Sequence, residues 1–214
     1  CYARQPMGGT PPASLAAMLS GAARASAGGC GGTDPRHRPG AHLPAAPPHT
    51  RADLPEDMSR VAAIQMASGP NTTANLGEAR RLVERAVGAG AELVVLPENF
   101  ALMGATEHDK VAVREREGDG PIQEFLAAQA ARHGVWIVGG TVPLVASVPE
   151  KVRAACLLYD DAGRQVARYD KIHLFDVSLG GAQEERYTES DTIEPGTEAV
   201  VADTPFGRIG LAVC

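Results

Sequence analysis

The sequence contains no run of apolar residues that approaches the roughly 20 needed to cross a bilayer. Its first residues also lack the positively charged segment and following apolar segment that mark a secretory signal. Basic residues are in the minority, with 20 Lys and Arg against 26 Asp and Glu, and no basic run forms the electrostatic footprint that nucleic acid requires. We therefore expect a cytoplasmic protein that binds neither a membrane nor a nucleic acid.

Cysteine is scarce as well, with four residues in 214. They lie at wide, irregular spacings that match neither a disulfide framework nor a zinc motif, namely at Cys1, Cys30, Cys156 and Cys214. We interpret them as reduced thiols. His37, His42 and His49 could in principle hold a metal ion together with Cys30, but their loose spacing favours a polar tail. The sequence thus predicts neither a metal site nor a bound cofactor.

The N-terminal stretch, residues 1–57, contains no Val, Ile, Phe or Trp and is interrupted by Pro, Gly and Ala. Because it cannot bury enough apolar surface to offset the entropy lost on ordering, we expect it to be disordered, apart from a short helix around Ser14–Leu19. Met58 directly precedes the first strand-like run. We hypothesise that Met58 is the biological start and that residues 1–57 are upstream-derived or vector-like sequence.

After Met58 the pattern alternates between buried strands and amphipathic helices. Capping and stop residues delimit the helices, with Asn71 and Pro121 at their starts, Gly88 and Gly90 as the stop of the first and Gly134 as the stop of the second. The predicted order is a strand at Val61–Met66, a helix from Asn71 to Gly90, a strand at Glu92–Leu96, a helix from Pro121 to Gly134 and a strand at Val135–Val138.

Two hairpins are predicted in the remaining sequence. Ala155–Tyr159 and Gln165–Tyr169 flank a turn that contains glycine, and Ala199–Asp203 and Arg208–Val213 flank another. Strands and helices in alternation, followed by hairpins, indicate an α/β layered fold with helices outside packed sheets.

Three reactive side chains each come at the end of an apolar strand, where side chains emerge into a cleft. Glu98 follows Leu93–Pro97 and could act as a general base. Lys171 follows the strand of the first hairpin and could stabilise an oxyanion. Cys214 ends an apolar strand with a thiol, which can serve as a nucleophile when a base lies nearby.

Each of these residues also has a structural interpretation. Glu98 could be an acid at a helix start, and Lys171 a surface cation paired with Asp170 or Asp176. A lone cysteine on a strand such as Cys214 is usually a small core residue. We assign Cys156, which has no acid or base neighbour in the sequence, to the core. His173 is more often a hydrogen-bonded structural residue than a base.

The ordered set of Leu-Pro-Glu98, Tyr-Asp-Lys171-Ile-His-Leu-Phe-Asp and Gly-Leu-Ala-Val-Cys214 resembles the Glu-Lys-Cys signature of the nitrilase superfamily. The resemblance covers residues 60–214. It implies an αββα sandwich in which Glu98 takes the proton of Cys214, the thiolate attacks an amide carbonyl and Lys171 stabilises the oxyanion. It also implies a thioester intermediate, and a second glutamate beside the lysine, for which Glu189 is the candidate, with a solvated loop acid as the alternative.

Within the superfamily, the segments around Lys171 and Glu189 resemble the Nit group of ω-amidases and deaminated glutathione amidases. This resemblance implies a small amide as substrate, such as an α-keto acid amide, ammonia release, and a homo-oligomer at full length. Nitrile hydrolysis, N-carbamoyl amino acid hydrolysis and a non-catalytic protein-binding role are the alternatives. A dinucleotide-binding domain is disfavoured, because Gly88-Ala89-Gly90 follows a helix and lacks a third glycine.

The resemblance also sets expectations for the extent of the domain. Domains of this family continue beyond the nucleophile, so we expect residues 58–214 to form the N-terminal part of a carbon–nitrogen hydrolase domain, incomplete at the C-terminus. We expect the 214-residue chain to have little or no activity. In the completed protein, Glu98→Gln and Lys171→Ala should each abolish turnover and leave the fold intact.

Overall fold

The computed structural model describes residues 58–179 and 185–214. The expectations for residues 1–57, including the helix around Ser14–Leu19 and the His and Cys30 set, lie outside these described residues. The elements in chain order are β1 (Val61–Ala63), α1 (Thr72–Gly88), β2 (Leu93–Leu96), α2 (Asp109–Ala112), α3 (Pro121–His133), β3 (Trp136–Val145), β4 (Val152–Tyr159), β5 (Gln165–Asp170), β6 (Asp176–Leu179), β7 (Glu185–Thr188), a 3-10 turn (Glu189–Asp191), β8 (Val200–Thr204) and β9 (Gly207–Leu211).

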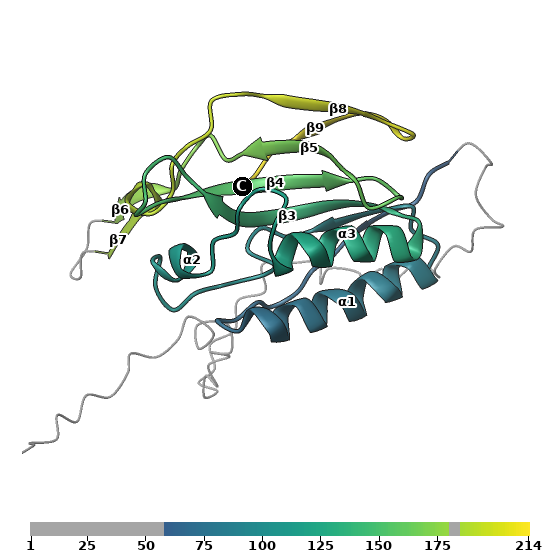
Figure 1. Ribbon diagram of the computed structural model, residues 1–214, viewed down its shortest axis with the longest axis horizontal. Coiled ribbons are helices and arrows are strands. Elements are labelled where there is room, and N and C mark those ends of the chain that lie inside the picture. Colours follow the sequence, from purple (N-terminus) through teal and green to yellow (C-terminus); the bar gives the residue numbers. More distant parts are fainter. Residues whose placement is uncertain (1–57, 180–184) are drawn as a thin grey trace, which may run out of the picture. The chain divides into compact units, whose positions relative to one another are not determined.

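A five-stranded sheet in the order β1-β2-β3-β4-β5 organises this part of the chain. β1, β2 and β3 pair in parallel, and β3, β4 and β5 pair antiparallel. The two parallel connections contain α1 and α3, which lie together on one face of the sheet (Figure 1). The predicted change from strand–helix alternation to antiparallel hairpins is therefore confirmed.

The sheet buries apolar side chains on both faces. On the helix side, the core of α1, α3 and the sheet includes Val83, Leu126 and Ile137. The opposite face is covered by the β8–β9 hairpin, which contributes Ala202 and Leu211 to a second core. The described residues thus form helix, sheet and sheet layers, which is an α/β arrangement with three layers of the expected αββα sandwich.

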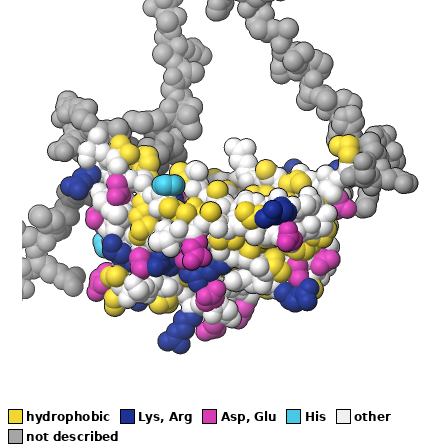
Figure 2. Space-filling view, turned by 90° about the horizontal axis from the view of Figure 1, so that it is seen from above, with side chains coloured by type: hydrophobic (Ala, Val, Ile, Leu, Met, Phe, Trp, Pro, Cys, Tyr) yellow, Lys and Arg dark blue, Asp and Glu magenta, His cyan; other side chains and the backbone are white. Residues whose placement is uncertain are grey.

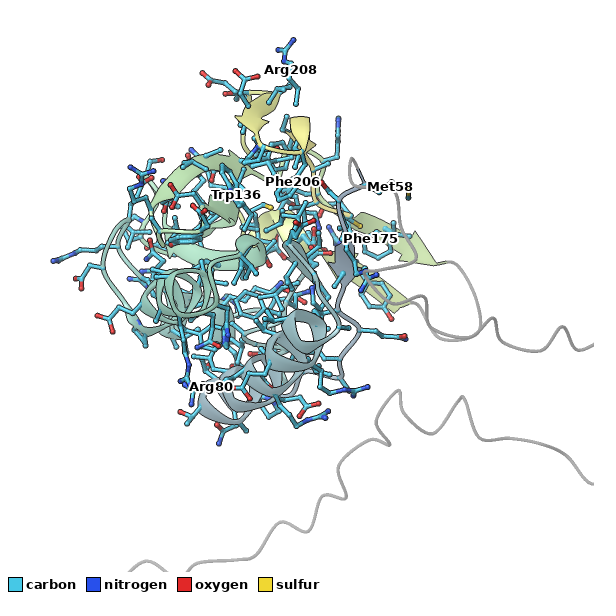
Figure 3. The ribbon with its side chains drawn as sticks, turned by 90° about the vertical axis from the view of Figure 1, so that its right-hand side faces the viewer. Met58, Arg80, Trp136, Phe175, Phe206 and Arg208 are labelled. Carbon is cyan, nitrogen blue, oxygen red and sulfur yellow. The ribbon has the colours of Figure 1, made fainter. Side chains whose placement is uncertain are left out.

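An aromatic pair joins the hairpin to the sheet. Phe206, in the β8–β9 turn, meets Trp136 of β3 edge to face, with ring centroids 6.2 Å apart (Figure 3).

The face of the molecule on the hairpin side carries mixed charges. Acidic and basic side chains alternate there among hydrophobic ones, and no patch of a single charge sign is seen (Figure 2). None of the described helices is both long and apolar enough to span a membrane.

Local capping explains where the two long helices begin and end. The Asn71 side chain accepts a hydrogen bond from the Ala74 N–H at 3.0 Å, which satisfies a free donor in the first turn of α1. Pro121 occupies the first turn of α3, where its missing N–H is not needed. Gly134 ends α3 in the left-handed conformation, with φ 61°. These boundaries were predicted from the sequence and are confirmed.

Other elements differ from the sequence-based prediction. The first strand is shorter than expected and lies at the sheet edge, where Val61 is exposed rather than buried. β3 extends to Val145, well past Val138, because it pairs along most of its length with β4. The short α2 and the β6–β7 hairpin were not predicted, because the stretches that form them are short and carry little apolar periodicity.

A bulge in β3 fits the chain around Glu98 against the sheet. The register of β3 with β4 shifts between Gly139 and Val142. Gly140 has φ +36°, and a Cβ added there would overlap the carbonyl oxygen of Pro97. The next residue, Thr141, accepts a hydrogen bond at its Oγ1 from the Asn99 N–H at 3.1 Å. The bulge therefore allows a close backbone approach on one side of Glu98 and anchors the chain on the other.

We expect Gly140→Ala to lower the free energy of unfolding by about 2 kcal/mol or more, because the added methyl group meets backbone and the residue keeps a positive φ. Gly77→Ala is the matched control, since a Cβ at this exposed helical position meets nothing within 4 Å. The control should stabilise the protein by about 1 kcal/mol. Urea denaturation followed by circular dichroism measures both, and equal effects of the two changes would contradict the role of the bulge.

Candidate active site

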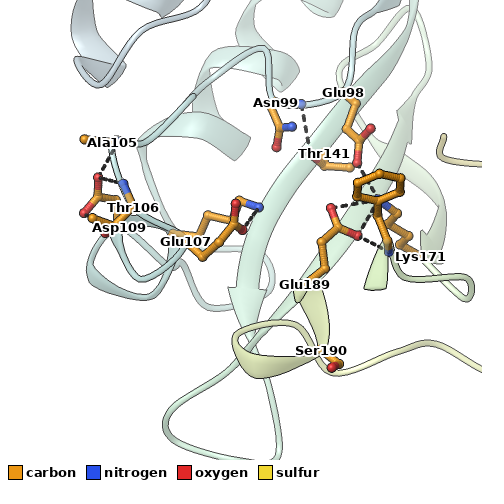
Figure 4. Close-up of polar contacts among 12 residues, drawn as sticks. Glu98, Asn99, Ala105, Thr106, Glu107, Asp109, Thr141, Lys171, Glu189 and Ser190 are labelled. Atoms are coloured by element: carbon orange, nitrogen blue, oxygen red, sulfur yellow. Dashed lines mark hydrogen bonds and ion pairs between the residues drawn. The ribbon is translucent and has the colours of Figure 1, made fainter. Parts of the chain in front are cut away.

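Three chain segments that are distant in sequence bring charged side chains together. Glu98 follows β2 after Pro97, Lys171 directly follows β5, and Glu189 follows β7. The Lys171 Nζ lies 2.9 Å from Glu98 Oε1, and 2.8 and 3.1 Å from the two carboxylate oxygens of Glu189 (Figure 4). One ammonium therefore joins two carboxylates that are far apart in the sequence.

Burial makes this cluster different from a surface ion pair. The Lys171 side chain is 1% exposed, against 29% for Glu98 and 16% for Glu189. Burial alone lowers the pKa of Lys171, but its hydrogen bonds to Glu189 and Glu98 outweigh this effect, so the pKa lies above its ordinary value. Lys171 is therefore a fixed cation at neutral pH.

The neighbouring acids have other partners, which excludes the surface interpretation of Lys171. Asp170 bonds Arg168 at 2.9 Å. Asp176 accepts the Ser190 N–H at 3.0 Å. His173, expected to be a hydrogen-bonded structural residue, is exposed.

Glu189 is held in place from two sides. Its Oε2 accepts the Phe175 N–H at 2.9 Å in addition to its contacts with Lys171. The Phe175 N–H belongs to the chain that leads into β6, so the unpredicted β6–β7 hairpin positions this carboxylate. Glu189 is therefore bonded to Lys171 and largely buried, which does not fit a solvated loop acid.

Cys214 shares a cavity with Glu98. The cavity has a volume of about 100 Å³, and Gly140 and Cys156 also line it. Cys214 is exposed, with φ 69°, three residues past the end of β9. The structure thus places the thiol and the carboxylate on the walls of one cavity, and the ammonium is hydrogen-bonded to that same carboxylate.

Cys156 differs from Cys214 in its surroundings. It is buried within β4, as expected for a core residue, and burial raises the pKa of its thiol to about 11. A thiol with so high a pKa is almost wholly protonated at neutral pH and is a poor nucleophile.

Among the described residues, no group of three or more His, Cys, Asp or Glu is arranged to hold a metal ion.

Two residues near the cluster were missed by the sequence analysis. Thr141 anchors the backbone after Glu98, and the Gly139-Gly140 pair inside a strand pattern was the available signal for its bulge. Lys110 lines a second, smaller cavity that Glu98 also lines. No signal in the sequence marked Lys110, because it lies in a polar run before the second long helix.

Comparison with known proteins places this geometry in a family context. The carbon–nitrogen hydrolase family model matches residues 60–214. The deaminated glutathione amidase of Yersinia enterocolitica is 41% identical over 157 residues, which are 73% of this chain and 54% of the relative. Omega-amidase NIT2 of Danio rerio is 32% identical over 155 residues, covering 72% of this chain and 54% of the relative.

The fold of the described residues is also similar to that of a solved structure. The NitFhit protein of C. elegans superposes with a TM-score of 0.63 at 30% identity, covering 73% of this chain and 39% of that one. The chain spans about half the length of the curated relatives it matches.

We expect alkylation to distinguish the two described cysteines. At pH 8, iodoacetamide should modify the exposed Cys214 readily and leave Cys156 unmodified, because burial and a pKa of about 11 keep the Cys156 thiol protonated. Peptide mass spectrometry under native conditions measures both sites, with urea-unfolded protein as the control in which both react. Equal labelling in the native protein would contradict the assignment of Cys156 to the core.

The burial of Lys171 revises the expectation that Lys171→Ala leaves the fold intact. The substitution leaves two facing carboxylates without their cation, so it should lower the free energy of unfolding by about 3 kcal/mol. Glu98→Gln keeps an oxygen acceptor for Lys171 and should change the stability far less. Urea denaturation of the two variants measures the difference, and a Lys171→Ala variant as stable as the parent would show that the cluster does not hold the strand ends together.

Proposed function

This chain belongs to the carbon–nitrogen hydrolase family, and we propose that the protein hydrolyses the terminal amide of a small carboxylate-bearing substrate through a cysteine thioester. Relatives that bear the names deaminated glutathione amidase and omega-amidase support amide hydrolysis as the reaction class. An α-keto acid amide or deaminated glutathione is the proposed substrate type. Ammonia is the first product.

A single observation carries the proposal. Glu98 touches the buried ammonium of Lys171 through Oε1 and lines the cavity that contains Cys214. An acid that shares one cavity with a thiol and one hydrogen bond with a fixed cation can serve both proton transfer and charge stabilisation. A core cysteine and a surface ion pair, the structural interpretations of these residues, do not account for this arrangement.

The first half of the proposed reaction forms the thioester. Glu98 accepts the Cys214 proton, and the Sγ attacks the amide carbonyl carbon, which forms a C–S bond and moves the carbonyl electron pair onto oxygen. The Lys171 ammonium donates to this oxyanion. When the oxyanion collapses, the C–N bond breaks, and the nitrogen takes the proton from Glu98 and leaves as ammonia.

The second half regenerates the thiol. Glu98 takes a proton from a water molecule, whose oxygen attacks the thioester carbonyl carbon while Lys171 again stabilises the oxyanion. The C–S bond then breaks, the carboxylic acid leaves, and the proton returns from Glu98 to Cys214. Lys171 occupies Oε1 of Glu98, so we assign the proton transfers to the second oxygen of the same carboxylate.

Glu189 acts on the reaction through Lys171 in this proposal. It accepts two hydrogen bonds from the ammonium and is itself fixed by the Phe175 N–H. These contacts keep Lys171 protonated and restrict its position. In the proposed reaction one N–H is shared between the two Glu189 oxygens, which leaves the third N–H for the negative charge that develops on the carbonyl oxygen. Glu189 is thus a positioning residue.

The setting we propose is cytoplasmic, where a nucleophilic thiol stays reduced, and the full-length protein is proposed to be a homo-oligomer. Because the curated relatives contain about as much chain again as the matched part, we propose that the 214-residue chain alone releases little or no ammonia. Assays of the reaction therefore use the full-length protein, with the 214-residue chain beside it.

We expect the full-length protein to release ammonia from a short α-keto acid amide. Cys214→Ala and Glu98→Gln should each lower kcat by about 10³-fold or more, because they remove the nucleophile and its base. His173→Gln is the matched control at an exposed ionisable residue next to the cluster, and should keep the parent rate. Coupled detection of ammonia measures all four proteins.

Other outcomes of this assay identify the alternatives. The protein could instead turn over a nitrile or an N-carbamoyl amino acid and not the keto acid amide, with the same loss of activity in Cys214→Ala. This result would show that the substrate belongs to another class and that the cysteine mechanism still holds. Absence of turnover on all three substrate types would overturn the proposed function and favour a protein-binding role.

A further inference from the structure

A small cavity lies beside Glu98, apart from the one that Cys214 lines. Its volume is about 20 Å³, and about 10–15 Å³ is enough to hold one water molecule. The walls come from β3, β4 and the segment after the 3-10 turn, and they include Val152 and Ile193, which are 1% and 2% exposed. The cavity therefore has room for one buried water and for nothing larger.

Thr141 lines this cavity from the bulge in β3. It is 6% exposed, and its Oγ1 accepts the Asn99 N–H at 3.1 Å (Figure 4). A hydroxyl group also has a proton to donate, and no acceptor among the described residues takes the one on Thr141. Because a buried donor without an acceptor is unfavourable, this hydroxyl calls for a partner that the protein does not supply.

Asn99 lines the same cavity in an uncommon backbone conformation. Its φ is 55°, which is left-handed and which Asn adopts more readily than most other residues with a side chain. The hydrogen bond from its N–H to Thr141 holds the chain there. Within the described ranges its side-chain amide makes no hydrogen bond, so a donor and an acceptor remain for a molecule in the cavity.

Two charged groups complete the polar lining of the cavity. One oxygen of the Glu98 carboxylate is taken by the buried ammonium, and a carboxylate has about four positions that accept hydrogen bonds. The Lys110 ammonium gives one N–H to Glu107, which compensates its charge, and it has further N–H groups. The hydroxyl and this ammonium thus offer donors, and the carboxylate and the Asn99 amide offer acceptors, which matches the hydrogen bonds that a buried water makes.

We propose that this cavity binds a single water molecule, which joins the Thr141 hydroxyl to the Glu98 carboxylate, and that Thr141 positions Glu98 through this water. Lys171 holds one oxygen of the carboxylate, and a single hydrogen bond leaves the carboxylate free to rotate. A second contact, through the water, fixes the plane of the carboxylate relative to the cavity of Cys214, and a water-mediated hydrogen bond is nearly as favourable as a direct one.

This water is distinct from the one that the proposed reaction consumes. Cys214 lines the larger cavity and not this one, so a water held here does not face a thioester on its sulfur. The inference rests on the proposed function for the role of Glu98 as the base. The water site itself depends only on the groups that line the cavity, so it is tested separately from turnover.

Crystal structures of the full-length protein, at a resolution that shows ordered water, test the water site. The parent and Thr141→Ser should each hold one water within hydrogen-bond distance of the hydroxyl at this position and of a Glu98 oxygen. Thr141→Val has nearly the same shape and no hydroxyl, and it should lose this water. A parent cavity without an ordered water, or the same water at the same place in Thr141→Val, would overturn the inference. The parent structure alone decides whether the water is bound, so the test does not depend on the stability of Thr141→Val.

Turnover of a short α-keto acid amide by the full-length protein tests the positioning role. We expect Thr141→Val to lower kcat about tenfold and to leave KM within about twofold, because the base is misplaced and no substrate contact is removed. Thr141→Ser keeps the hydroxyl and should recover kcat to within about threefold of the parent. Thr73→Val is the matched control at an exposed threonine of α1 and should keep the parent rate.

The two kinds of measurement separate the possible failures. An unchanged kcat in Thr141→Val, or an equal loss in Thr141→Val and Thr141→Ser, would overturn the positioning role. A parent that turns over no amide would instead overturn the proposed function, and the crystal structures would still decide the water site.

Discussion

The buried ammonium of Lys171 is the interaction on which the arrangement of the site depends. An ion that is 1% exposed must have its charge compensated within the protein, and Glu98 and Glu189 do this from two different strand ends. The contacts therefore tie the end of β2, the end of β5 and the turn after β7 to one point. Any movement of one strand end against the others would leave a buried charge without its partner.

The sheet supplies the convergence that this cluster needs. β3 is the strand at which parallel pairing changes to antiparallel pairing, so it lies between the strand that leads to Glu98 and the hairpin that leads to Lys171. The bulge at Gly140 and Thr141 occurs in that strand, where the chain after β2 crosses closest to it. The irregularity thus lies where a residue with a Cβ would overlap the carbonyl oxygen of Pro97.

Glu98 lines two cavities of different character. One has the exposed thiol of Cys214 on its wall, and the other has the ammonium of Lys110. In the proposed reaction, bond making takes place in the first cavity. The chain on both sides of this carboxylate approaches β3, Pro97 at Gly140 and Asn99 at Thr141.

The sequence by itself determined the helix limits at Asn71, Pro121 and Gly134, because caps and breakers act within a few residues. It also indicated Glu98, Lys171 and Cys214 as candidates, through short motifs at strand ends and the family they resemble. Only the tertiary structure decided that Lys171 is buried, that Asp170 pairs with an arginine instead, and that Glu98 and Cys214 line one cavity. Burial and partner choice depend on which distant segments meet, and no local pattern encodes that.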